Sequence, residues 1–267
     1  MTTVLGSYSE AGGVCKTTHA VSLAMTAALA GRNVLLIDLD PRASATRWLT
    51  VEPTKPGLDV SAIIAADDCD GWADELAVPA PDGWSPNLRV VPAGRRLATL
   101  EGQLPHGVEL RLMRAIEGTT ADLVVIDCPN RQGGPLTLNA LFAANALIIA
   151  AKPDTDGREG VEGAYTTIAR HRQTLDRLGS TRRLDVLGIV VGNGRDVIVP
   201  RIEKHTLAEL DNTWPGQVLR PVIPSRTIVR EAREAGTWYG NFPSSAPVVE
   251  AYAAIAAQIL HTMKEPA

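Results

Sequence analysis

The stretch Glu10-Ala11-Gly12-Gly13-Val14-Cys15-Lys16-Thr17-Thr18 decides the fold expected of this chain. It lies between a short apolar run at Val4 and Leu5 and a long helical pattern that starts at Lys16. Phosphate-binding loops typically lie in such a place, between a strand and a helix, because their backbone N–H groups and the first helical turn then face a polyphosphate. Glu10 and Cys15 replace both glycines of the strict pattern G-x-x-x-x-G-K-[ST], so a glycine-rich turn without a ligand stays an alternative.

The residue types in this loop suit a nucleotide. Gly12 and Gly13 let the backbone approach an anion closely, Lys16 supplies a positive charge, and Thr17 offers a hydroxyl to Mg²⁺. The sequence therefore predicts a nucleotide site made of Gly12, Gly13, Val14, Cys15, Lys16, Thr17 and Thr18.

Composition limits the classes of protein that fit. Of the 267 residues 45% are hydrophobic and 21% charged, which is typical of a globular chain. The net charge of −4 means that any nucleic-acid contact must come from a local basic patch. Three distant cysteines show no metal-binding spacing and suit a reducing cytoplasm. We expect no signal peptide, and the longest apolar segment, Ala20 to Ala30, is too short to span a bilayer.

Buried strands and helices alternate along the chain. A helical pattern runs from Lys16 to Ala30, and apolar runs without polar alternation indicate strands that are buried on both faces. This order predicts an α/β fold, a doubly wound, mostly parallel sheet flanked by helices, of the P-loop NTPase type, with ligands at the strand C-termini. We expect one domain over residues 1–267. The predicted strands are Val34–Ile37, Leu123–Ile126, Ala146–Ala151 and Val186–Val191, and further helices are predicted at Leu110–Glu117, Gly157–Leu178, Ile198–Leu210 and around Tyr252.

The segment Ala65–Pro86 departs from this alternation. It is rich in Asp, Pro and Ala, and it carries Trp72 and Trp84. A long surface connection with one short helix is one interpretation. A partner-docking surface is the other, because aromatic residues on irregular segments often anchor interfaces.

Acidic residues close two of the predicted strands. Asp38 and Asp40 follow Ile37, and Asp127 follows Ile126. A carboxylate at the end of a buried strand is costly unless a cation or a hydrogen-bond donor faces it. Mg²⁺ held together with Thr17 and a nucleotide would be such a partner, and a cap on the following helix is the structural alternative.

These motifs together resemble the ParA/MinD family of deviant Walker ATPases, and most closely its ParA-type partition and positioning proteins. The family writes KGGVGKTT, LIDxDPQ and IIDCPP where this chain has AGGVCKTT, LIDLDPR and VIDCPN. The segment Leu147–Pro153 with Glu159-Gly160, and Ile223-Pro224-Ser225 with Arg230-Glu231-Ala232, resemble later family segments. The match runs in order from the N-terminus to about Leu260, so it covers nearly the whole chain.

The resemblance implies a role for each matching residue. Lys16 would hold the β- and γ-phosphates of ATP, and Thr17 would ligate Mg²⁺. Asp127 would reach the metal, and Asp40 would orient the attacking water or help to hold the metal. Asn193 and Pro224 would frame adenine.

The resemblance also implies how such a protein works. The family forms a sandwich homodimer with ATP, binds DNA non-specifically, and releases it when a cargo-bound partner stimulates hydrolysis. For this chain it implies weak, stimulated hydrolysis of ATP to ADP and phosphate, a ParB-like or adaptor partner, and a plasmid, chromosome or protein organelle as cargo. The expected location is cytoplasmic and nucleoid-associated.

The lysine that defines the family is absent, because Ala11 stands in its place. The family's lysine reaches across the dimer to the partner's phosphates. Lys152 is the preferred substitute, since it follows a strand on the ligand side of the sheet; Arg42, Arg131 or no substitute are the alternatives. Cys15 is either a tolerated small residue in a strained position or a reactive thiol, because a helix N-terminus and Lys16 would lower its pKa.

Basic residues concentrate between Arg195 and Arg233 despite the acidic total. This pattern predicts non-specific DNA binding, and an ordinary solvated face is the alternative. The residues after Leu260 are too few for an amphipathic membrane helix, so we expect no membrane attachment. Two other functions stay open, an ATP-binding regulator or scaffold with little hydrolysis and a metabolic P-loop enzyme such as a ligase. The predicted DNA contacts are Arg201, Lys204, Arg226, Arg230 and Arg233.

Overall fold

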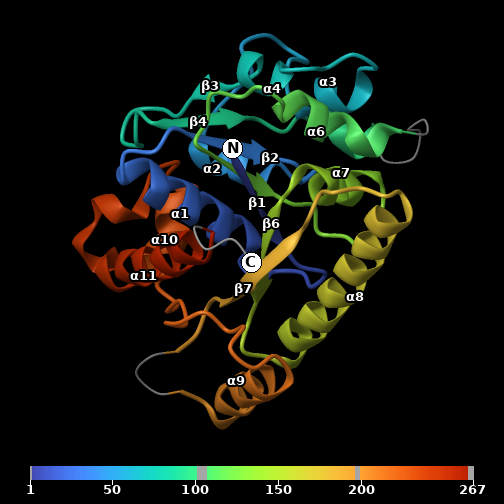
Figure 1. Cartoon of the computed structure of the whole chain (residues 1–267). Helices are drawn as coiled ribbons and strands as arrows, with labels where there is room; N and C mark the ends of the chain where they lie inside the picture. The colour runs from blue at the N-terminus through green and yellow to red at the C-terminus, as the bar shows by residue number, and fades with distance from the viewer. Residues whose placement is uncertain (1, 101–106, 196–198, 264–267) are drawn as a thin grey trace.

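A seven-stranded sheet forms the centre of the protein in the computed structural model (Figure 1). The model describes all residues except 1, 101–106, 196–198 and 264–267. The strand order is β3-β4-β2-β5-β1-β6-β7, and all neighbours are parallel except β3 and β4. The predicted doubly wound, mostly parallel sheet is therefore confirmed. The strands are β1 (Thr3–Tyr8), β2 (Val34–Asp38), β3 (Val78–Pro79), β4 (Leu88–Val91), β5 (Leu123–Asp127), β6 (Ala146–Ala151) and β7 (Asp185–Val191).

Helices cover both faces of this sheet (Figure 1). One face carries α1 (Lys16–Leu29), α2 (Ser44–Leu49), α10 (Thr227–Glu234) and α11 (Ala246–Thr262). The other face carries α3 (Val60–Ala65), α4 (Trp72–Glu75), α5 (Arg96–Leu100), α6 (Arg111–Ile116), α7 (Pro135–Ala143) and α8 (Thr155–Arg177), and α9 (Arg201–Thr213) packs beside α8. No helix within the described ranges has the length and apolar character needed to cross a membrane.

The apolar runs fold as strands because each of them is buried on both faces. All five residues of β2 are buried, and Leu35 and Ile37 enter one core while Val34 and Leu36 enter the other. Successive side chains of a strand point to opposite faces, so an unbroken apolar run supplies both cores. Each buried aliphatic side chain contributes about 1.5–3 kcal/mol, which fixes the strands that carry the site.

The Asp- and Pro-rich segment Ala65–Pro86 contains α4 and the short edge strand β3. Trp84 is only 7% exposed, and its ring lies 6.2 Å from that of Trp48 and 5.9 Å from that of Trp238. Trp72 is partly buried against the other core. Both indoles therefore serve packing, which favours the surface connection over the partner-docking surface. The sequence also missed β4, and the predicted helix start at Ile198 lies outside the described residues.

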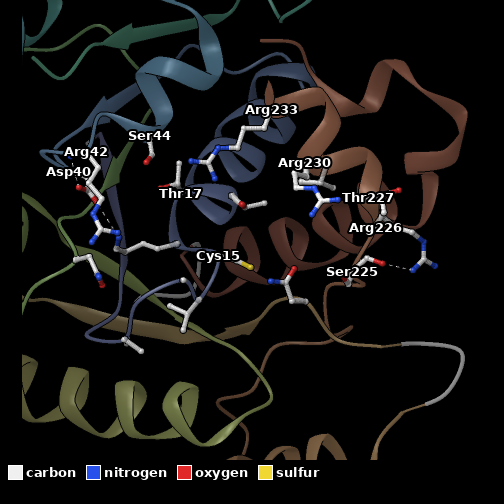
Figure 2. A pocket seen from close by; sticks show the side chains of 18 residues that line it. Cys15, Thr17, Asp40, Arg42, Ser44, Ser225, Arg226, Thr227, Arg230 and Arg233 are labelled. Atoms are coloured by element: carbon white, nitrogen blue, oxygen red, sulfur yellow. Dashed lines mark hydrogen bonds and ion pairs between the residues drawn. The ribbon is translucent and has the colours of Figure 1, made fainter. Parts of the chain in front are cut away.

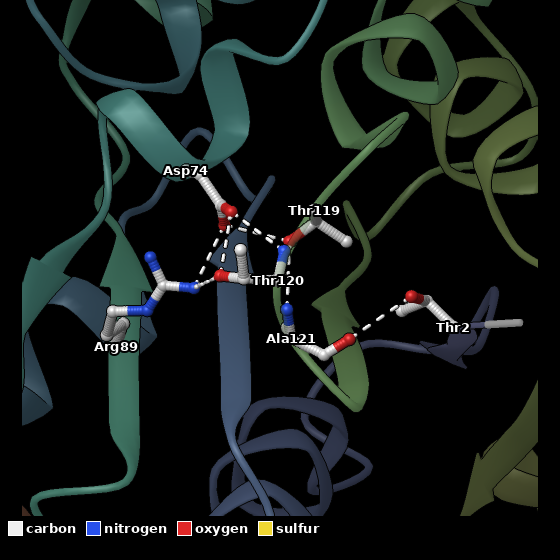
Figure 3. Close-up of polar contacts among 6 residues, drawn as sticks. All are labelled: Thr2, Asp74, Arg89, Thr119, Thr120 and Ala121. Atoms are coloured by element: carbon white, nitrogen blue, oxygen red, sulfur yellow. Dashed lines mark hydrogen bonds and ion pairs between the residues drawn. The ribbon is translucent and has the colours of Figure 1, made fainter.

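A polar cluster fastens this segment to the edge of the sheet that is opposite the strand C-termini (Figure 3). Asp74 on α4 accepts hydrogen bonds from Arg89 on β4 at 2.9 Å, from Thr119 Oγ1 at 2.8 Å and from the Thr120 N–H at 2.8 Å. Burial raises the pKa of Asp74, but these hydrogen bonds and the Arg89 charge outweigh burial and lower it. The cluster therefore stabilises the position of α4 through an ionised carboxylate.

Candidate functional site

A cavity of about 490 Å³ opens where the parallel strands end (Figure 2). The loop between β1 and α1 forms one wall through Gly13, Cys15 and Lys16. Segments that follow three other strands contribute Asp40, Asn130 and Asn193. The last wall comes from the segment Ser225–Arg233 around α10. The sheet therefore brings these distant segments together at the edge where ligands bind in doubly wound folds.

The loop holds two residues in the left-handed backbone region. Gly13 has a φ of 67°, and Cys15 has a φ of 66° with a ψ of 16° directly before α1. A residue with a Cβ pays roughly 1–2 kcal/mol for this conformation, whereas glycine adopts it freely. The backbone therefore keeps the glycine-like turn that the motif requires, and the predicted strain at Cys15 is present.

Lys16 and Asp40 face one another inside the cavity. Lys16 Nζ lies 3.5 Å from Asp40 Oδ2, and each side chain is 7% exposed. The other oxygen of Asp40 accepts a hydrogen bond from the Arg42 N–H at 2.9 Å. The pair lets both charges stay buried beside the loop. Asp40 is thus held where the sequence predicted a group that acts on the phosphates.

Asp127 is completely buried, and the structure supplies it with little compensation. Burial raises its pKa to about 7; the Lys16 charge and the Thr17 hydroxyl oppose this rise, while Asp38 adds to it. Within the described part of the chain, neither carboxylate oxygen of Asp127 has a hydrogen-bond partner of good geometry. A buried carboxylate without a partner beside a threonine hydroxyl fits a hydrated Mg²⁺, which prefers oxygen ligands.

Asp38 has a different role from the other two acids. It accepts hydrogen bonds from the Thr46 N–H at 2.8 Å, from Thr46 Oγ1 at 2.7 Å and from the Asp40 N–H at 3.2 Å. Burial still raises its pKa to about 6. Asp38 therefore holds the turn that leads into α2. Of the two interpretations of the acids that follow the strands, a metal site or a cap on the next helix, the cap applies to Asp38.

Lys152, the preferred substitute for the missing lysine, lies next to the loop. Its Nζ is 3.6 Å from the point where a Cβ on Gly13 would sit. Lys152 is not among the residues that line the cavity, whereas Arg42 is. Ala11 packs on α8, since a Cβ added at Gly160 would come within 2.5 Å of the Ala11 Cβ. Proximity to the loop thus supports Lys152, and the role itself stays a prediction.

The thiol of Cys15 is not activated. Burial raises its pKa to about 11, although the charges of Lys152 and Arg233 act in the opposite direction. The thiol is therefore protonated at neutral pH, and the reactive-thiol interpretation is not supported.

The two residues predicted to frame adenine differ in position. Asn193 lines the cavity with a left-handed φ of 56°. Pro224 does not line it, but Pro224 pairs with Gly194 in an isolated β-bridge, and the Ser225 N–H donates to Gly194 O at 2.9 Å. Ser225 therefore takes the cavity-facing place expected of Pro224. The sequence also missed Ser44, Asn130 and Thr227, of which Asn130 could have been found because it closes the VIDCPN motif.

The structure divides the five basic residues predicted to contact DNA. Arg226, Arg230 and Arg233 line the cavity. In Figure 2 Arg233 points toward the loop beside Thr17. Arg201 and Lys204 lie on α9, which Figure 1 shows well apart from α10. The three arginines of α10 and its N-terminus are thus placed to meet a bound anion in the cavity.

Comparisons with known proteins agree with this geometry. A family model described as an AAA domain matches residues 2–178. The chromosome-partitioning ATPase Soj of Thermus thermophilus is 30% identical over 259 residues, which cover 96% of this chain and 95% of Soj. The chromosome partitioning protein ParA of Caulobacter vibrioides is 29% identical over 241 residues, 87% of this chain and 84% of ParA.

Solved structures share the fold over nearly the whole chain. A cobyrinic acid a,c-diamide synthase from Mycobacterium smegmatis, solved with ADP and magnesium, has a TM-score of 0.78 and 27% identity, and the match covers 99% of this chain and 96% of that one. An ATP complex of Cyanothece McdA has a TM-score of 0.80 at 21% identity, with coverage of 97% and 96%. The second likeness concerns the fold alone.

Proposed function

This chain belongs to the ParA/MinD family of deviant Walker ATPases, and we propose that it is a ParA-like ATPase that positions or segregates a cargo. It hydrolyses ATP to ADP and phosphate slowly, and DNA and a partner protein stimulate the reaction. ATP closes a homodimer, and the dimer binds DNA without sequence specificity. Relatives named as chromosome-partitioning proteins, and a neighbour solved with ADP and magnesium, support this proposal.

One observation carries the proposal most directly. One cavity is lined by Lys16, by the first turn of α1 and by the arginines of α10. Asp40 is the only acidic residue in the described lining of this cavity. Backbone N–H groups at a helix N-terminus, a lysine and several guanidinium groups are the donors that a polyphosphate requires. A cavity with this excess of positive charge suits a nucleoside triphosphate.

Residues that line the cavity or lie beside it can share the work of hydrolysis. Lys16 binds the phosphates, and Asp40 orients the water that attacks the terminal phosphorus. Thr17 and Asp127 would hold Mg²⁺, which neutralises charge on the phosphate oxygens when it is bound. Asn193 and Ser225 flank the base. Lys152 supplies the cation that the loop lost at Ala11.

Binding and turnover test these roles together. Binding of a fluorescent ATP analogue with Mg²⁺ is expected to fall at least tenfold in Lys16→Ala, because the phosphates lose their main charge partner. Lys152→Ala is expected to keep binding but to lose ATPase activity or ATP-dependent dimerisation. The control is Lys55→Ala, an exposed lysine outside the cavity. Wild-type turnover and dimerisation in Lys152→Ala would exclude Lys152 as the substitute.

DNA binding is tested separately by retardation of plasmid DNA with ATP present. Arg201→Ala combined with Lys204→Ala alters α9 and leaves the cavity unchanged, so a loss of retardation with intact ATP binding would assign α9 to DNA. An unchanged shift would remove α9 from the proposed DNA surface.

Ala11 favours one alternative, a nucleotide-dependent regulator or scaffold with little hydrolysis. The residue cannot contribute charge to a partner's phosphates. Turnover that stays at background with ATP, Mg²⁺ and DNA, while ATP still drives dimerisation, would identify this second function. A ligase is the other alternative, because the Mycobacterium neighbour is named a synthase. ATP turnover that requires an organic acid and an amide donor would distinguish a ligase from a positioning ATPase.

A further inference from the structure

The wall of the cavity that α10 and the residues before it form carries a row of arginines. Arg226, Arg230 and Arg233 line the cavity and are spaced four and three residues apart. Residues at this spacing lie on one face of a helix, so the row extends over about 10 Å. Figure 2 shows Arg233 beside Thr17 at one end of the row, Arg230 in the middle and Arg226 near Ser225 at the other end. Arg226 Nη1 donates a hydrogen bond to Ser225 O at 2.9 Å.

Carboxylates do not balance this arginine row. Asp40 is the only acidic residue in the described lining of the cavity, and its carboxylate already faces Lys16 Nζ at 3.5 Å. In the part of the chain that the structure describes, the side chains of Arg230 and Arg233 form no ion pair and no hydrogen bond. A guanidinium group presents a planar fork of donors that matches a phosphate group. The row is therefore available to the anionic groups of a ligand.

The 5′-phosphates of a nucleotide reach only one end of the arginine row. In the proposed function Lys16 and Thr17 meet the phosphates. Asn193 and Ser225 flank the base, so the ribose lies between the phosphates and the base, beside Arg230. ATP carries no negative charge on its ribose, and bound Mg²⁺ cancels part of the charge on its phosphates. The middle of the row thus has no anionic partner when ATP is bound.

The type of residue beside a ribose indicates what the ribose carries. In dinucleotide-binding folds an acidic residue accepts hydrogen bonds from the ribose hydroxyls, whereas an arginine accommodates a phosphate on the ribose. In the described lining of this cavity the acid, Asp40, pairs with Lys16, and the α10 wall presents Arg230. This wall therefore suits a ribose that carries a phosphate.

The packing around α10 fixes the backbone that carries the arginine row. Ala232 is 1% exposed and belongs to the core beneath the helix. Two indole groups hold the chain directly after α10. Trp84 Nε1 donates to Gly236 O at 3.4 Å, and Trp48 Nε1 donates to Thr237 O at 3.0 Å. A wall held in this way needs little rearrangement when a ligand arrives, which favours binding.

We propose that the cavity binds an adenosine nucleotide that carries a phosphate on its ribose in addition to its 5′-phosphates. Arg233 meets the 5′-phosphates near Thr17, and Arg230 binds the ribose phosphate through its guanidinium fork. This ligand occupies the same cavity as ATP, so the two compete. The inference rests on the proposed function for the places of the base and the 5′-phosphates.

The test compares ADP with two ADP derivatives, one phosphorylated at the ribose 3′-oxygen and the other at the 2′-oxygen. Each compound displaces a fluorescent ATP analogue from the full chain in the presence of Mg²⁺, and no turnover is needed. We expect one derivative to bind at least tenfold more tightly than ADP, and the position of its phosphate identifies the ligand. Arg230→Gln should reduce this gain to less than threefold. The affinity ratio of ATP to ADP, measured in the same variant, shows whether the loss is specific to the ribose phosphate.

Two control variants separate the arginine row from general effects of charge. Arg177→Gln removes an exposed arginine at the end of α8, outside the cavity. Glu231→Gln changes an exposed charge on α10 that is not part of the cavity lining. Both variants should keep the gain from the ribose phosphate within twofold of the wild-type value.

Several results would overturn the inference. Equal affinities for ADP and both derivatives would do so, as would a gain that survives Arg230→Gln. Equal weakening of ATP, ADP and both derivatives in this variant would assign Arg230 to the 5′-phosphates. Loss of plasmid retardation in Arg230→Gln with an unchanged gain would assign Arg230 to DNA instead. Absence of binding by every nucleotide would refute the proposed function as well, whereas binding of ADP and ATP without the gain would refute this inference alone.

Discussion

Replacing Asp127 with asparagine should change the stability of the nucleotide-free protein in a pH-dependent way, and the change should be more favourable at pH 8 than at pH 5. Burial raises the pKa of Asp127 from 3.8 to about 7, with Asp38 and Asp40 adding to the rise and Lys16 opposing it. A carboxyl group with a folded-state pKa above its unfolded value favours folding only while it is protonated. Its contribution to the free energy of unfolding therefore falls as pH rises from about 4 to about 7, and it is constant above that range.

The magnitude follows from the same values. From pH 5 to pH 8 the ionisation of Asp127 should lower the free energy of unfolding of the wild-type protein by about 2–3 kcal/mol, because each pKa unit corresponds to about 1.4 kcal/mol. Asparagine has nearly the same shape but cannot ionise. It adds the cost of a buried amide, about 1–3 kcal/mol, at both pH values. The change in stability caused by Asp127→Asn should thus be about 2–3 kcal/mol more favourable at pH 8 than at pH 5.

Urea unfolding in EDTA measures this difference, with the buried tryptophans Trp48, Trp84 and Trp238 as the fluorescent probes. Asp38→Asn is the comparison, because Asp38 is equally buried but accepts hydrogen bonds from Thr46, so its loss should destabilise the protein at both pH values. Its change in stability should also vary less between pH 5 and pH 8 than that of Asp127→Asn, because the pKa of Asp38 is raised only to about 6. The same stability change for Asp127→Asn at pH 5 and pH 8 would refute the assignment of Asp127 as a buried carboxylate that lacks compensation.

Three further outcomes are expected. Cys15 should react with iodoacetamide at neutral pH far more slowly than a free thiol, since burial raises its pKa to about 11, and rapid modification seen by mass spectrometry would contradict this. Asp74→Asn should lower the free energy of unfolding by about 1–3 kcal/mol at neutral pH, and by progressively less as pH falls below about 4, because hydrogen-bond donors lower the pKa of Asp74. The control is Asp82→Asn at an exposed position, and a loss that does not depend on pH would contradict this prediction. Gly160→Ala should weaken ATP binding because the new methyl meets Ala11, and adding Ala11→Gly should restore part of the affinity in a double-mutant cycle, whereas an additive result would place the effect elsewhere.

The sequence predicted most of the fold because four strands carry unbroken apolar runs that are buried on both faces. It missed β4 because the run Leu88–Val91 is short, includes Arg89 and follows an Asp- and Pro-rich segment. Arg89 is tolerated there because it pairs with Asp74 near the edge of the sheet. The charge inside β4 is thus explained by a contact with a residue of another element. An apolar pattern along the sequence does not predict such contacts.

The sequence predicted those parts of the site that depend only on where a residue lies relative to the end of one strand. The loop before α1 and the acids after β2 and β5 must meet at one edge of a parallel sheet. The separate roles of Asp38 and Asp40 were not predictable, because both follow the same strand and only the turn after Ile37 directs one to Thr46 and the other to Lys16.

The position of Lys152 changes what the missing loop lysine implies for the catalytic cycle. In the family the lysine acts across the dimer, so its charge reaches a phosphate only after two protomers meet. Lys152 lies beside Gly13 of its own protomer, because the C-terminal end of β6 adjoins the loop. If it supplies the missing charge, the cation is present before dimerisation, and control of hydrolysis must come from another contact. Glu10 ties the same loop to α8, because its carboxylate accepts a hydrogen bond from Thr167 Oγ1.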